Sequence, residues 1–161
     1  VLSRRRDGGF FYPSAGGLYP IDVYIYVKRD RVEGLEEGFY YYNPVEHKLS
    51  PLELPGGITD EEHFVTNKEI YNSSALTMIF VYNGNCNMPR YDGNGYFFGI
   101  IDMGIMVENV CLQCATGILG ACSIGDMDFI ALEEKMQLKR NHRVLHVVEI
   151  GVDAAGEGTE D

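Results

Sequence analysis

Hydrophobic and polar positions alternate with a period of two in several short stretches of the chain, which is the pattern of half-buried β-strands. Ile21–Val27 is rich in β-branched and aromatic residues, and Gly38–Asn43 and Lys48–Leu54 flank a short turn. Leu76–Tyr82 is almost wholly apolar, as expected of a buried strand, and Arg143–Val152 is the final candidate. These stretches predict a sheet in which two strands form a hairpin.

Three other segments have the features of helices. Thr59 is a good N-cap and two glutamates follow it in the first turn, which predicts a helix to about Ser73. Tyr96–Thr116 is long and apolar, and Asp128–Leu138 is amphipathic. Because helices are intermixed with a meander-like sheet, we expect an α+β domain with a central antiparallel or mixed sheet flanked by helices.

The segment Tyr96–Thr116 needs a separate interpretation, because its length and apolarity also suit a membrane span. Its ~21 residues reach about 30 Å at 1.5 Å per residue. Asp102 and Glu108 fall inside it, however, and charges at mid-bilayer are costly. We therefore expect a buried central helix. A helix that is apolar nearly all round needs cover on every side, so we also expect a dimer interface along it.

Composition indicates a single globular domain over residues 1–161. Of these 161 residues, 45% are hydrophobic and 12% aromatic, which is enough for a core without metal or disulfides. The formal charge is −11, from 24 acidic and 13 basic residues, so we expect neither nucleic acid nor an anionic membrane as a partner. Val1–Gly9 resembles a flexible lead-in and residues 153–161 a disordered acidic tail.

The start of the chain and its cysteines bear on compartment and metal content. The first residues are basic and Gly-rich, unlike a signal peptide, and the chain opens on Val1, which suggests an N-terminally shortened domain. Four cysteines do not make a secreted framework, so we expect the cytoplasm. A four-cysteine zinc site is conceivable, formed by Cys111 and Cys114 with Cys86 and Cys122. The chain has no second C-x-x-C motif, however, so buried small side chains are the simpler interpretation of these cysteines. We therefore expect no metal.

The most informative motif is Tyr12–Pro20, which has the sequence YPSAGGLYP and precedes the first predicted strand. Its two prolines fix the backbone on either side. Gly16 and Gly17 permit conformations closed to other residues and would let a flat ligand approach the main chain. From spacing alone, an ordinary loop turning into a strand remains the alternative.

Four segments together resemble the nitroreductase-like flavoproteins, and in particular their SagB-type dehydrogenase branch, which includes thiazoline and oxazoline oxidases. They are PSAGGLYP at 13–20, GFYYYNPVEHKL at 38–49, RYDGNGYFFGIIDMG at 90–104 and GILGACSIGD at 117–126. The resemblance implies a nitroreductase-like fold, FMN as cofactor, and a homodimer with the flavin in a cleft at the interface. It also implies an FMN-dependent oxidase or dehydrogenase that acts on an azoline ring in a peptide or carrier-tethered substrate, with O2 restoring the oxidised flavin.

The same resemblance implies that the glycine loop lines the flavin ring. Close backbone approach is needed on one face of the ring, and open space for substrate on the other. Main-chain groups and the Ser14 hydroxyl would satisfy the polar edge of the ring. The residues implied in this role are Pro13, Ser14, Ala15, Gly16 and Gly17.

A second flavin contact is implied at the turn of Ile124, Gly125 and Asp126, which Ser123 precedes. Its backbone N–H groups would point at flavin N5 and O4 and stabilise the negative charge that reduction creates. Asp126 stands where the family commonly has a second glycine. Its carboxylate would oppose a reduced, anionic flavin unless it turns away.

Arg90 and Tyr91 stand where azoline oxidases of the family carry Lys-Tyr, and we assign them to catalysis. Dehydrogenation sends a hydride to the flavin and a proton to a base. Tyr91 can relay a proton, whereas Arg90 cannot easily take one because guanidinium stays protonated at ordinary pH. Arg90 would instead polarise the ring nitrogen or anchor a carrier-bound substrate.

Departures from the family pattern keep alternatives open. Members bind the FMN phosphate through Arg and Ser residues of a helix before the glycine loop. We expect either that this helix was removed with the rest of the chain or that Arg4–Arg6, Arg140, His142 and Arg143 replace it. An NAD(P)H-dependent nitro- or quinone reductase and a flavin-free docking or dimerisation module are the two alternatives. The segment around Ser123 also faintly resembles a nucleophile elbow, which would need Asp128 and His142 or His146 to form a triad.

Overall fold

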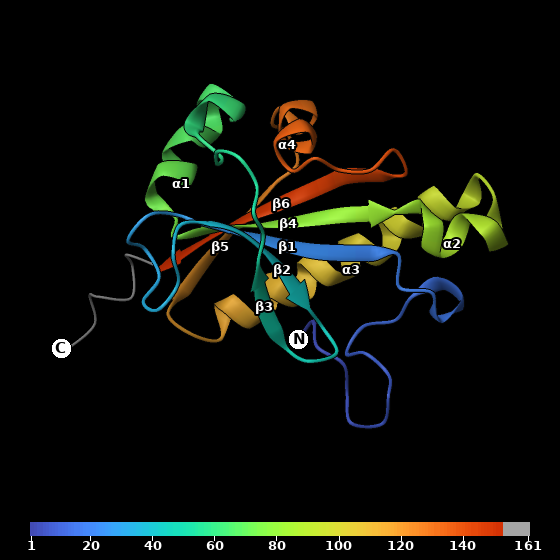
Figure 1. Ribbon diagram of the computed structural model, residues 1–161. Helices are drawn as coiled ribbons and strands as arrows, with labels where there is room; N and C mark the ends of the chain where they lie inside the picture. The colour runs from blue at the N-terminus through green and yellow to red at the C-terminus, as the bar shows by residue number, and fades with distance from the viewer. Residues whose placement is uncertain (153–161) are drawn as a thin grey trace.

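The computed structural model describes residues 1–152, which form one six-stranded sheet with helices on both faces (Figure 1). The strand order is β3-β2-β1-β4-β6-β5, and each neighbouring pair in the described chain is antiparallel. The predicted α+β class is confirmed, and the sheet is antiparallel rather than mixed. The strands are β1 (Ile21–Val27), β2 (Gly38–Asn43), β3 (Lys48–Pro51), β4 (Leu76–Asn83), β5 (Leu119–Ile124) and β6 (His142–Val152).

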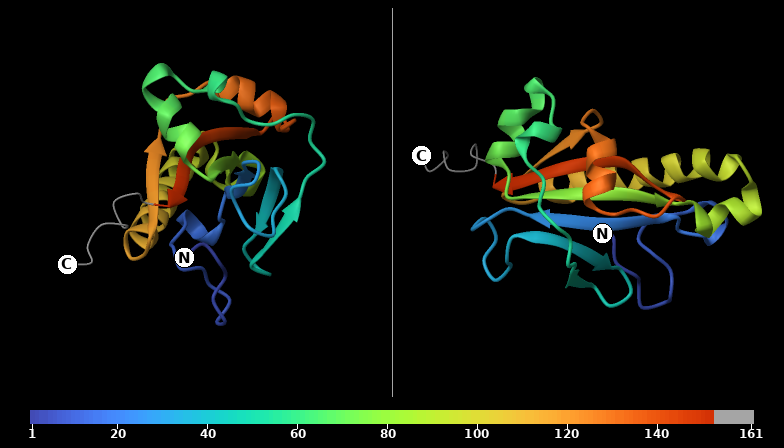
Figure 2. Two further views of the ribbon diagram at one scale, coloured as in Figure 1. Left: turned by 90° about the vertical axis from the view of Figure 1, so that its left-hand side faces the viewer. Right: turned by 45° about the horizontal axis from the view of Figure 1, so that its top comes forward.

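The helices divide between the two faces of the sheet, as Figure 2 shows. The long helix α3 lies along one face, and the short helices α1 and α4 lie on the other. Helix α2 follows β4 at one end of the sheet and leads into α3. The helices are α1 (Lys68–Ser73), α2 (Gly84–Tyr91), α3 (Asn94–Ala115) and α4 (Phe129–Lys135), with 3-10 turns η1 (Ala15–Gly17), η2 (Asp60–Glu62) and η3 (Val65–Asn67).

The predicted helix from Thr59 to Ser73 is wrong as a single element. Thr59 caps only the short turn η2, where its side chain and that of Glu62 form a capping box. His63 is then extended, with φ −96° and ψ 138°, and forms an antiparallel bridge with Met127. Thr59 was thus correctly predicted as an N-cap. The predicted helix does not continue, because His63 pairs with the distant Met127 before α1 begins.

Two elements, α2 and β5, have little signal in the sequence. Helix α2 begins at Gly84 and contains Pro89, and both residue types are unfavourable in helices. Strand β5 contains small residues and follows a helix, so its segment resembled a turn. In the structure β5 pairs with β6 from Leu119 to Ile124, and the turn begins only after it.

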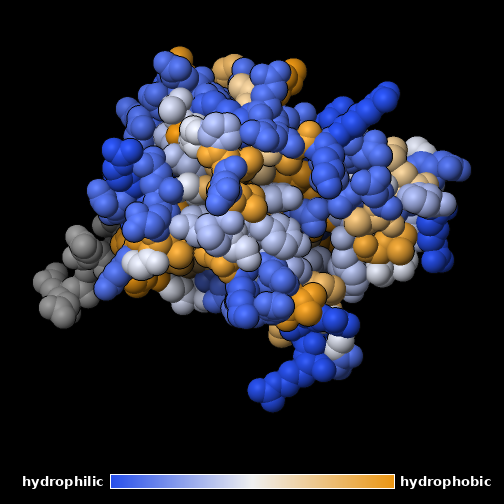
Figure 3. Space-filling view, viewed as in Figure 1, coloured by the Kyte–Doolittle hydropathy of each residue, from blue (hydrophilic) through white to orange (hydrophobic). Residues whose placement is uncertain are grey.

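Two of the three hydrophobic clusters in the described residues lie between the sheet and its helices. Phe80 and Met106 are buried in the core under α3, and Ile79 and Leu132 are buried in the core under α1 and α4. Truncating such side chains to alanine costs about 2–5 kcal/mol each. The outer surface is largely hydrophilic on the face shown in Figure 3, with separate apolar patches.

A buried ion pair fixes the end of the sheet opposite α2. The carboxylate of Glu149 accepts hydrogen bonds from Ser74 Oγ at 2.5 Å, Thr77 Oγ1 at 2.7 Å and Lys28 Nζ at 3.1 Å. Burial lowers the pKa of Lys28, and the neighbouring Glu149 charge opposes that shift. Because a buried charge needs several partners to be tolerated, this network ties β1, β4, β6 and the end of α1 together.

Helix α3 is only partly covered within one chain, as expected of a helix that one domain cannot cover on every side. Asp102 and Met106 are buried, whereas Phe97 is 59% exposed, Ile101 45% and Leu112 56%. We call these three residues the α3 stripe; their spacings of four and eleven residues place them on one helix face. The helix is also long and apolar enough to cross a membrane. Its inner face belongs to the core under the sheet, as in a globular domain.

The N-terminal segment, predicted as a flexible lead-in, contributes one core residue. Leu2 is buried in the core under α3. Arg4 and Phe10 form an antiparallel bridge, and the Arg4 N–H donates to the Pro44 carbonyl at 2.7 Å. The segment therefore packs on the turn between β2 and β3. The predicted acidic tail, residues 153–161, lies outside the described residues.

The buried pair predicts a coupled loss of stability. Lys28→Ala should lower the free energy of unfolding by about 3 kcal/mol, because Glu149 is left buried without its cation. The double variant Lys28→Met/Glu149→Leu should lose less than the sum of the single variants, since no uncompensated charge remains. Urea denaturation followed by circular dichroism measures both. Arg29→Ala breaks the exposed pair with Glu37 and should change little. Losses that simply add would contradict the coupling.

Candidate functional site

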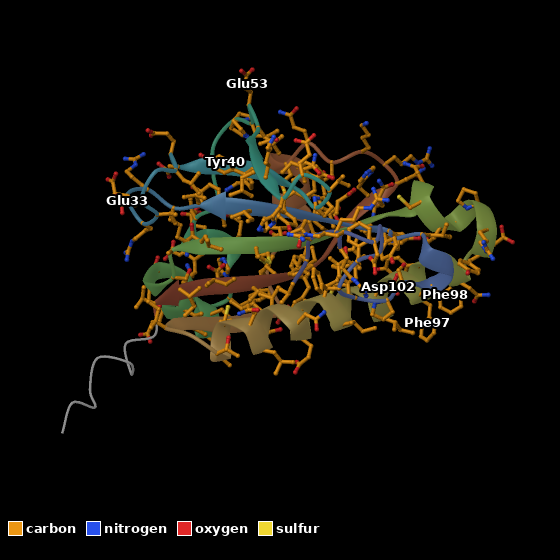
Figure 4. The ribbon with its side chains drawn as sticks, turned by 90° about the horizontal axis from the view of Figure 1, so that it is seen from below. Glu33, Tyr40, Glu53, Phe97, Phe98 and Asp102 are labelled. Carbon is orange, nitrogen blue, oxygen red and sulfur yellow. The ribbon has the colours of Figure 1, made fainter. Side chains whose placement is uncertain are left out.

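Asp102 holds the glycine loop against helix α3. This carboxylate is only 4% exposed, and it accepts hydrogen bonds from Ser14 Oγ at 2.5 Å and from the Ala15 N–H at 3.3 Å. Ser14 Oγ in turn accepts from the Tyr19 N–H at 2.9 Å. Figure 4 shows Asp102 near the α2 end of α3. Within the chain, the Ser14 hydroxyl thus donates one hydrogen bond and accepts another.

The two glycines of the loop have different surroundings. Both have left-handed backbones, with φ +64° at Gly16 and +67° at Gly17. A Cβ at Gly16 would lie 2.4 Å from the hydroxyl oxygen of Tyr91, whereas a Cβ at Gly17 would meet nothing within 4 Å. Gly16 makes room for Tyr91, and Gly17 alone faces open space.

Helix α2 brings Arg90 and Tyr91 to this loop. Arg90 Nε lies 3.6 Å from the position of a Cβ at Gly16. The Tyr91 ring packs edge-on against Phe98 with centroids 5.0 Å apart, and the Arg90 Cζ lies 5.5 Å from the Tyr91 centroid. The structure thus joins two motifs that lie far apart in the sequence. We call Pro13–Gly17, Arg90, Tyr91 and Asp102 the loop site; Pro13 is exposed and Ala15 half-buried within it.

Asn87 fixes the corner between α2 and α3 that carries Tyr91. It is fully buried, accepts from the Tyr82 hydroxyl at 2.7 Å, and donates through Nδ2 to the Gly95 carbonyl at 2.8 Å. Sequence reasoning assigned neither Asn87 nor Asp102 to the site. For Asp102 the sequence did contain a signal, because a charged residue stands out in an apolar helix. For Asn87 it contained no signal, because the helix α2 that carries it was not predicted.

The second predicted cluster, Ser123–Asp126, lies where β5 ends and is here called the turn site. The Ile124 side chain is buried in the core, so this residue offers only its main chain. Gly125 is exposed, and a Cβ there would lie 3.5 Å from His146 Cε1. Asp126 is exposed and its carbonyl accepts from Asn67 Nδ2 at 3.1 Å.

Ser123 and His146 form a close pair at the turn site. Ser123 Oγ and His146 Nε2 are 2.5 Å apart, and burial lowers the pKa of His146. A serine triad is not completed by Asp128, because its Oδ1 accepts from the Ala131 N–H at 2.9 Å and caps α4. The sequence suggested the serine and offered two histidines, and the structure selects His146.

The loop site and the turn site are separated in one chain. The loop precedes β1 and the turn follows β5, and β4 and β6 lie between these strands. Three strand spacings of about 4.8 Å amount to about 14 Å. Helix α3 contacts both regions, through Asp102 at the loop and through the core beside β5.

The cysteines offer no metal centre within residues 1–152. No group of three or more His, Cys, Asp or Glu side chains there is arranged to hold a metal. The cysteines are free, and burial raises the pKa of Cys86, Cys111 and Cys114. These thiols therefore lack the character of metal-binding thiolates.

Comparison with known sequences identifies relatives over most of the chain. The profile of the nitroreductase family matches residues 1–152. MJ1384 of Methanocaldococcus jannaschii, whose name assigns it provisionally to the nitroreductases, is 29% identical over 128 residues, covering 79% of this chain and 63% of that protein. Indigoidine synthase of Streptomyces lavendulae is 33% identical over 81 residues, 46% of this chain and 6% of the synthase. The chain spans less than two thirds of either relative.

Solved structures share the fold. A Ralstonia eutropha JMP134 protein with the same provisional assignment superposes with a TM-score of 0.77 at 27% identity, covering 95% of this chain and 67% of that one. The Escherichia coli microcin synthetase McbBCD complex with truncated pro-MccB17 bound gives a TM-score of 0.76 at 20% identity, covering 94% and 59%. The nitroreductase-like fold is therefore confirmed; at 20% identity the second likeness concerns the fold alone.

Asp102→Ala should loosen the glycine loop. The carboxylate accepts from both Ser14 and Ala15, and its removal should cost about 1–3 kcal/mol. Amide hydrogen exchange at residues 14–19 should speed up, and urea denaturation should report the lost stability. Glu108→Ala is the matched control, because Glu108 is an exposed carboxylate on the same helix. Unchanged exchange in the Asp102 variant would refute its anchoring role.

Proposed function

The chain belongs to the nitroreductase family, and we propose that it is an FMN-dependent oxidase that dehydrogenates thiazoline or oxazoline rings in a peptide. Members of this family are FMN-dependent oxidoreductases. The observation that carries the finer proposal is the convergence of Arg90 and Tyr91 on the glycine loop, with the Tyr91 hydroxyl against Gly16.

The residues present fit the ring of FMN at both sites. Gly17 leaves the main chain of the loop open, and the exposed Gly125 does the same at the turn. Pro13, Ala15 and Gly17 would hold a face of the ring, and main-chain N–H groups of the turn would meet its polar edge. Bound FMN would supply the hydride acceptor, and the surrounding residues would orient the substrate and manage its proton.

Three of the arginines proposed for the FMN phosphate, Arg4, Arg5 and Arg143, bond groups within the chain. Arg5 pairs with Asp7 at 2.5 Å. Arg143 Nη1 donates to the carbonyls of Arg140 at 3.3 Å and His142 at 2.8 Å. We therefore expect the ring contacts to contribute most of the FMN affinity of this chain.

Tyr91 and Arg90 would act on the substrate from the loop site. Removing two hydrogens from an azoline sends a hydride to the flavin and a proton to the protein, and positioned proton transfer contributes about 10²–10⁴-fold to rate. The Tyr91 phenol can relay that proton, and its ring is held by Phe98. Arg90 stays cationic and would polarise the ring nitrogen or anchor the peptide or its carrier.

We further propose that the protein works as a homodimer, the usual state in this family. The α3 stripe is an uncovered apolar face on an otherwise core helix. A second subunit packed on it would also allow one flavin to contact a loop site and a turn site that are separated by three strand spacings in one chain. Both features support a flavin shared between subunits.

An NAD(P)H-dependent nitro- or quinone reductase is the second candidate. The relatives at 29% and 27% identity are both named provisionally as nitroreductases. Such an enzyme would use the same two sites but would accept hydride from the nicotinamide instead of from an azoline.

Flavin reduction separates these functions. The chain is mixed with FMN, freed of excess, and made anaerobic. Bleaching of the flavin absorbance by a thiazoline-containing dipeptide, with formation of the thiazole, would support the oxidase. Bleaching by NADPH alone would establish the reductase instead. If the chain retains no FMN at any FMN concentration, the remaining interpretation is a flavin-free docking or dimerisation module.

Tyr91→Phe should slow flavin reduction by the dipeptide by about 10²-fold while FMN content stays constant, because only the proton-carrying hydroxyl is lost. Stopped-flow absorbance gives the rate and the protein-to-flavin ratio gives the content. Tyr96→Phe is the control, since Tyr96 is an exposed tyrosine on α3 that packs against Tyr82. An unchanged rate would remove Tyr91 from the mechanism.

Ile101→Asp should convert the dimer to monomers, because it places a charge in the centre of the α3 stripe. If the flavin is shared, FMN should be lost with the dimer. Light scattering after size-exclusion chromatography and the flavin absorbance measure the two effects. Ile130→Asp is the control, because Ile130 is 72% exposed on α4 at the other face of the sheet. A dimer that survives Ile101→Asp would place the interface elsewhere.

A further inference from the structure

The Ser123–His146 pair is held by the sheet itself. Ser123 lies opposite Val148 in the β5–β6 ladder, so His146 is its diagonal neighbour on the same face. The Ser123 Oγ to His146 Nε2 distance is 2.5 Å. Ser123 is exposed and His146 half-buried, so the hydroxyl faces solvent while the ring is held beneath it. A side chain on a strand is more rigidly placed than one on a loop, and this pair needs no induced movement to form.

The imidazole is prepared to accept a proton. Burial lowers the pKa of His146, and no charged group in the described chain contributes to that shift. The groups placed against the ring, Ser123 Oγ, the Gly125 backbone and the paired Phe80, are uncharged. The ring is therefore neutral near pH 7, and its Nε2 is free to accept the Ser123 hydroxyl proton when Nδ1 carries the hydrogen.

The pair also provides what the loop site lacks. Arg90 cannot accept a proton, and the Tyr91 phenol can pass one on but needs a final acceptor. We infer that Ser123 and His146 form a proton-transfer pair that serves as the base of the turn site and takes the proton leaving the substrate. This inference rests on the proposed dehydrogenation and adds its acid–base group.

The proton movement balances without another reagent. As the bond to the departing substrate proton breaks, the Tyr91 phenol takes up that proton and passes its own proton to Ser123 Oγ, and the Ser123 hydroxyl proton moves to His146 Nε2. Bound FMN would supply the hydride acceptor, so the substrate would lose two hydrogens in all, and the ring of His146 becomes an imidazolium. Release of the proton to solvent restores the neutral pair. Tyr91 is the catalytic residue here, and Ser123 and His146 act through it.

A hydrolytic nucleophile is a poorer interpretation of the same two residues. A serine nucleophile needs its histidine oriented by a third group. Asp128 is committed to the cap of α4. The pair is thus suited to moving a proton and not to forming an acyl-enzyme.

The first experiment is independent of FMN. The chain of residues 1–161, labelled with ¹⁵N-histidine, is examined by NMR at pH 7.5, where His146 should carry its hydrogen on Nδ1 with Nε2 unprotonated. Ser123→Ala should shift the tautomer toward Nε2–H, and Ser123→Thr should restore the original signal because it keeps the hydroxyl. A hydrogen on Nε2 in the wild-type chain would reverse donor and acceptor and overturn the inference.

The second experiment measures flavin reduction by the thiazoline dipeptide from pH 5 to 9 in the FMN-loaded chain. The wild-type rate should fall as the pH drops through the lowered pKa of His146, because the imidazolium cannot accept a proton. His146→Gln should reduce the rate by about 10²-fold and remove this acid limb, with the FMN dissociation constant unchanged. Ser123→Ala should slow the reaction similarly.

His47→Gln is the matched control, because the His47 ring also bonds a hydroxyl, that of Tyr42 at 2.9 Å, but lies in the turn between β2 and β3. It should keep both the rate and the acid limb. An acid limb that persists in His146→Gln, or a wild-type rate in Ser123→Ala, would overturn the inference. If NADPH but not the dipeptide reduces the wild-type flavin, the proposed oxidase activity is wrong, and the assignment of the Ser123–His146 pair to azoline protons is wrong with it. The NMR experiment distinguishes that result from the absence of the hydrogen bond between Ser123 and His146.

Discussion

The hydrogen bonds between Asp102 and the Ser14–Ala15 segment are the interaction on which the loop site depends. A carboxylate buried in an apolar helix must find donors, because an unpaired buried charge costs several kcal/mol. The loop supplies these donors through a hydroxyl and a main-chain N–H. The helix and the loop therefore require each other. Once the loop is placed, Gly16 meets Tyr91 and the two motifs become one site.

Helix α3 divides its surface between two roles. Its inner face completes the core against the sheet, and its outer face carries the α3 stripe. On the sheet beneath it, β1 and β5 are separated by β4 and β6, so the loop and turn sites do not coincide within one chain. A flavin shared across a two-fold interface would account for both the uncovered stripe and the separation. The buried Lys28–Glu149 network, at the far end of the sheet, stabilises the scaffold without entering either site.

The two sites carry complementary chemistry. The loop site has a permanent cation, Arg90, beside a phenol that can pass a proton on. The turn site has a neutral imidazole held by a serine hydroxyl. The resemblance leads one to expect a lysine base at position 90, but this chain has Arg90, which cannot accept a proton. A base on another element of the fold is consistent with that change. Proton transfer would then depend on His146 of β6, which the sequence offered only as a possible member of a serine triad.

The sequence by itself determined the elements whose signals are local: the strands β1, β4 and β6, the hairpin of β2 and β3, the long helix, and the glycine motif with its departure at Arg90. It misjudged the segment from Thr59 to Ser73 and did not separate β5 from the turn after it, because pairing with Met127 and with β6 decided those conformations. Only the tertiary structure showed that Gly16 accommodates Tyr91, that Asp102 anchors Ser14, and that His146 rather than His142 meets Ser123. The physical reason is that periodicity, caps and glycine freedom act within a few residues, whereas a buried carboxylate or a side-chain pair is satisfied by partners that only the packing of distant strands and helices brings within hydrogen-bond reach.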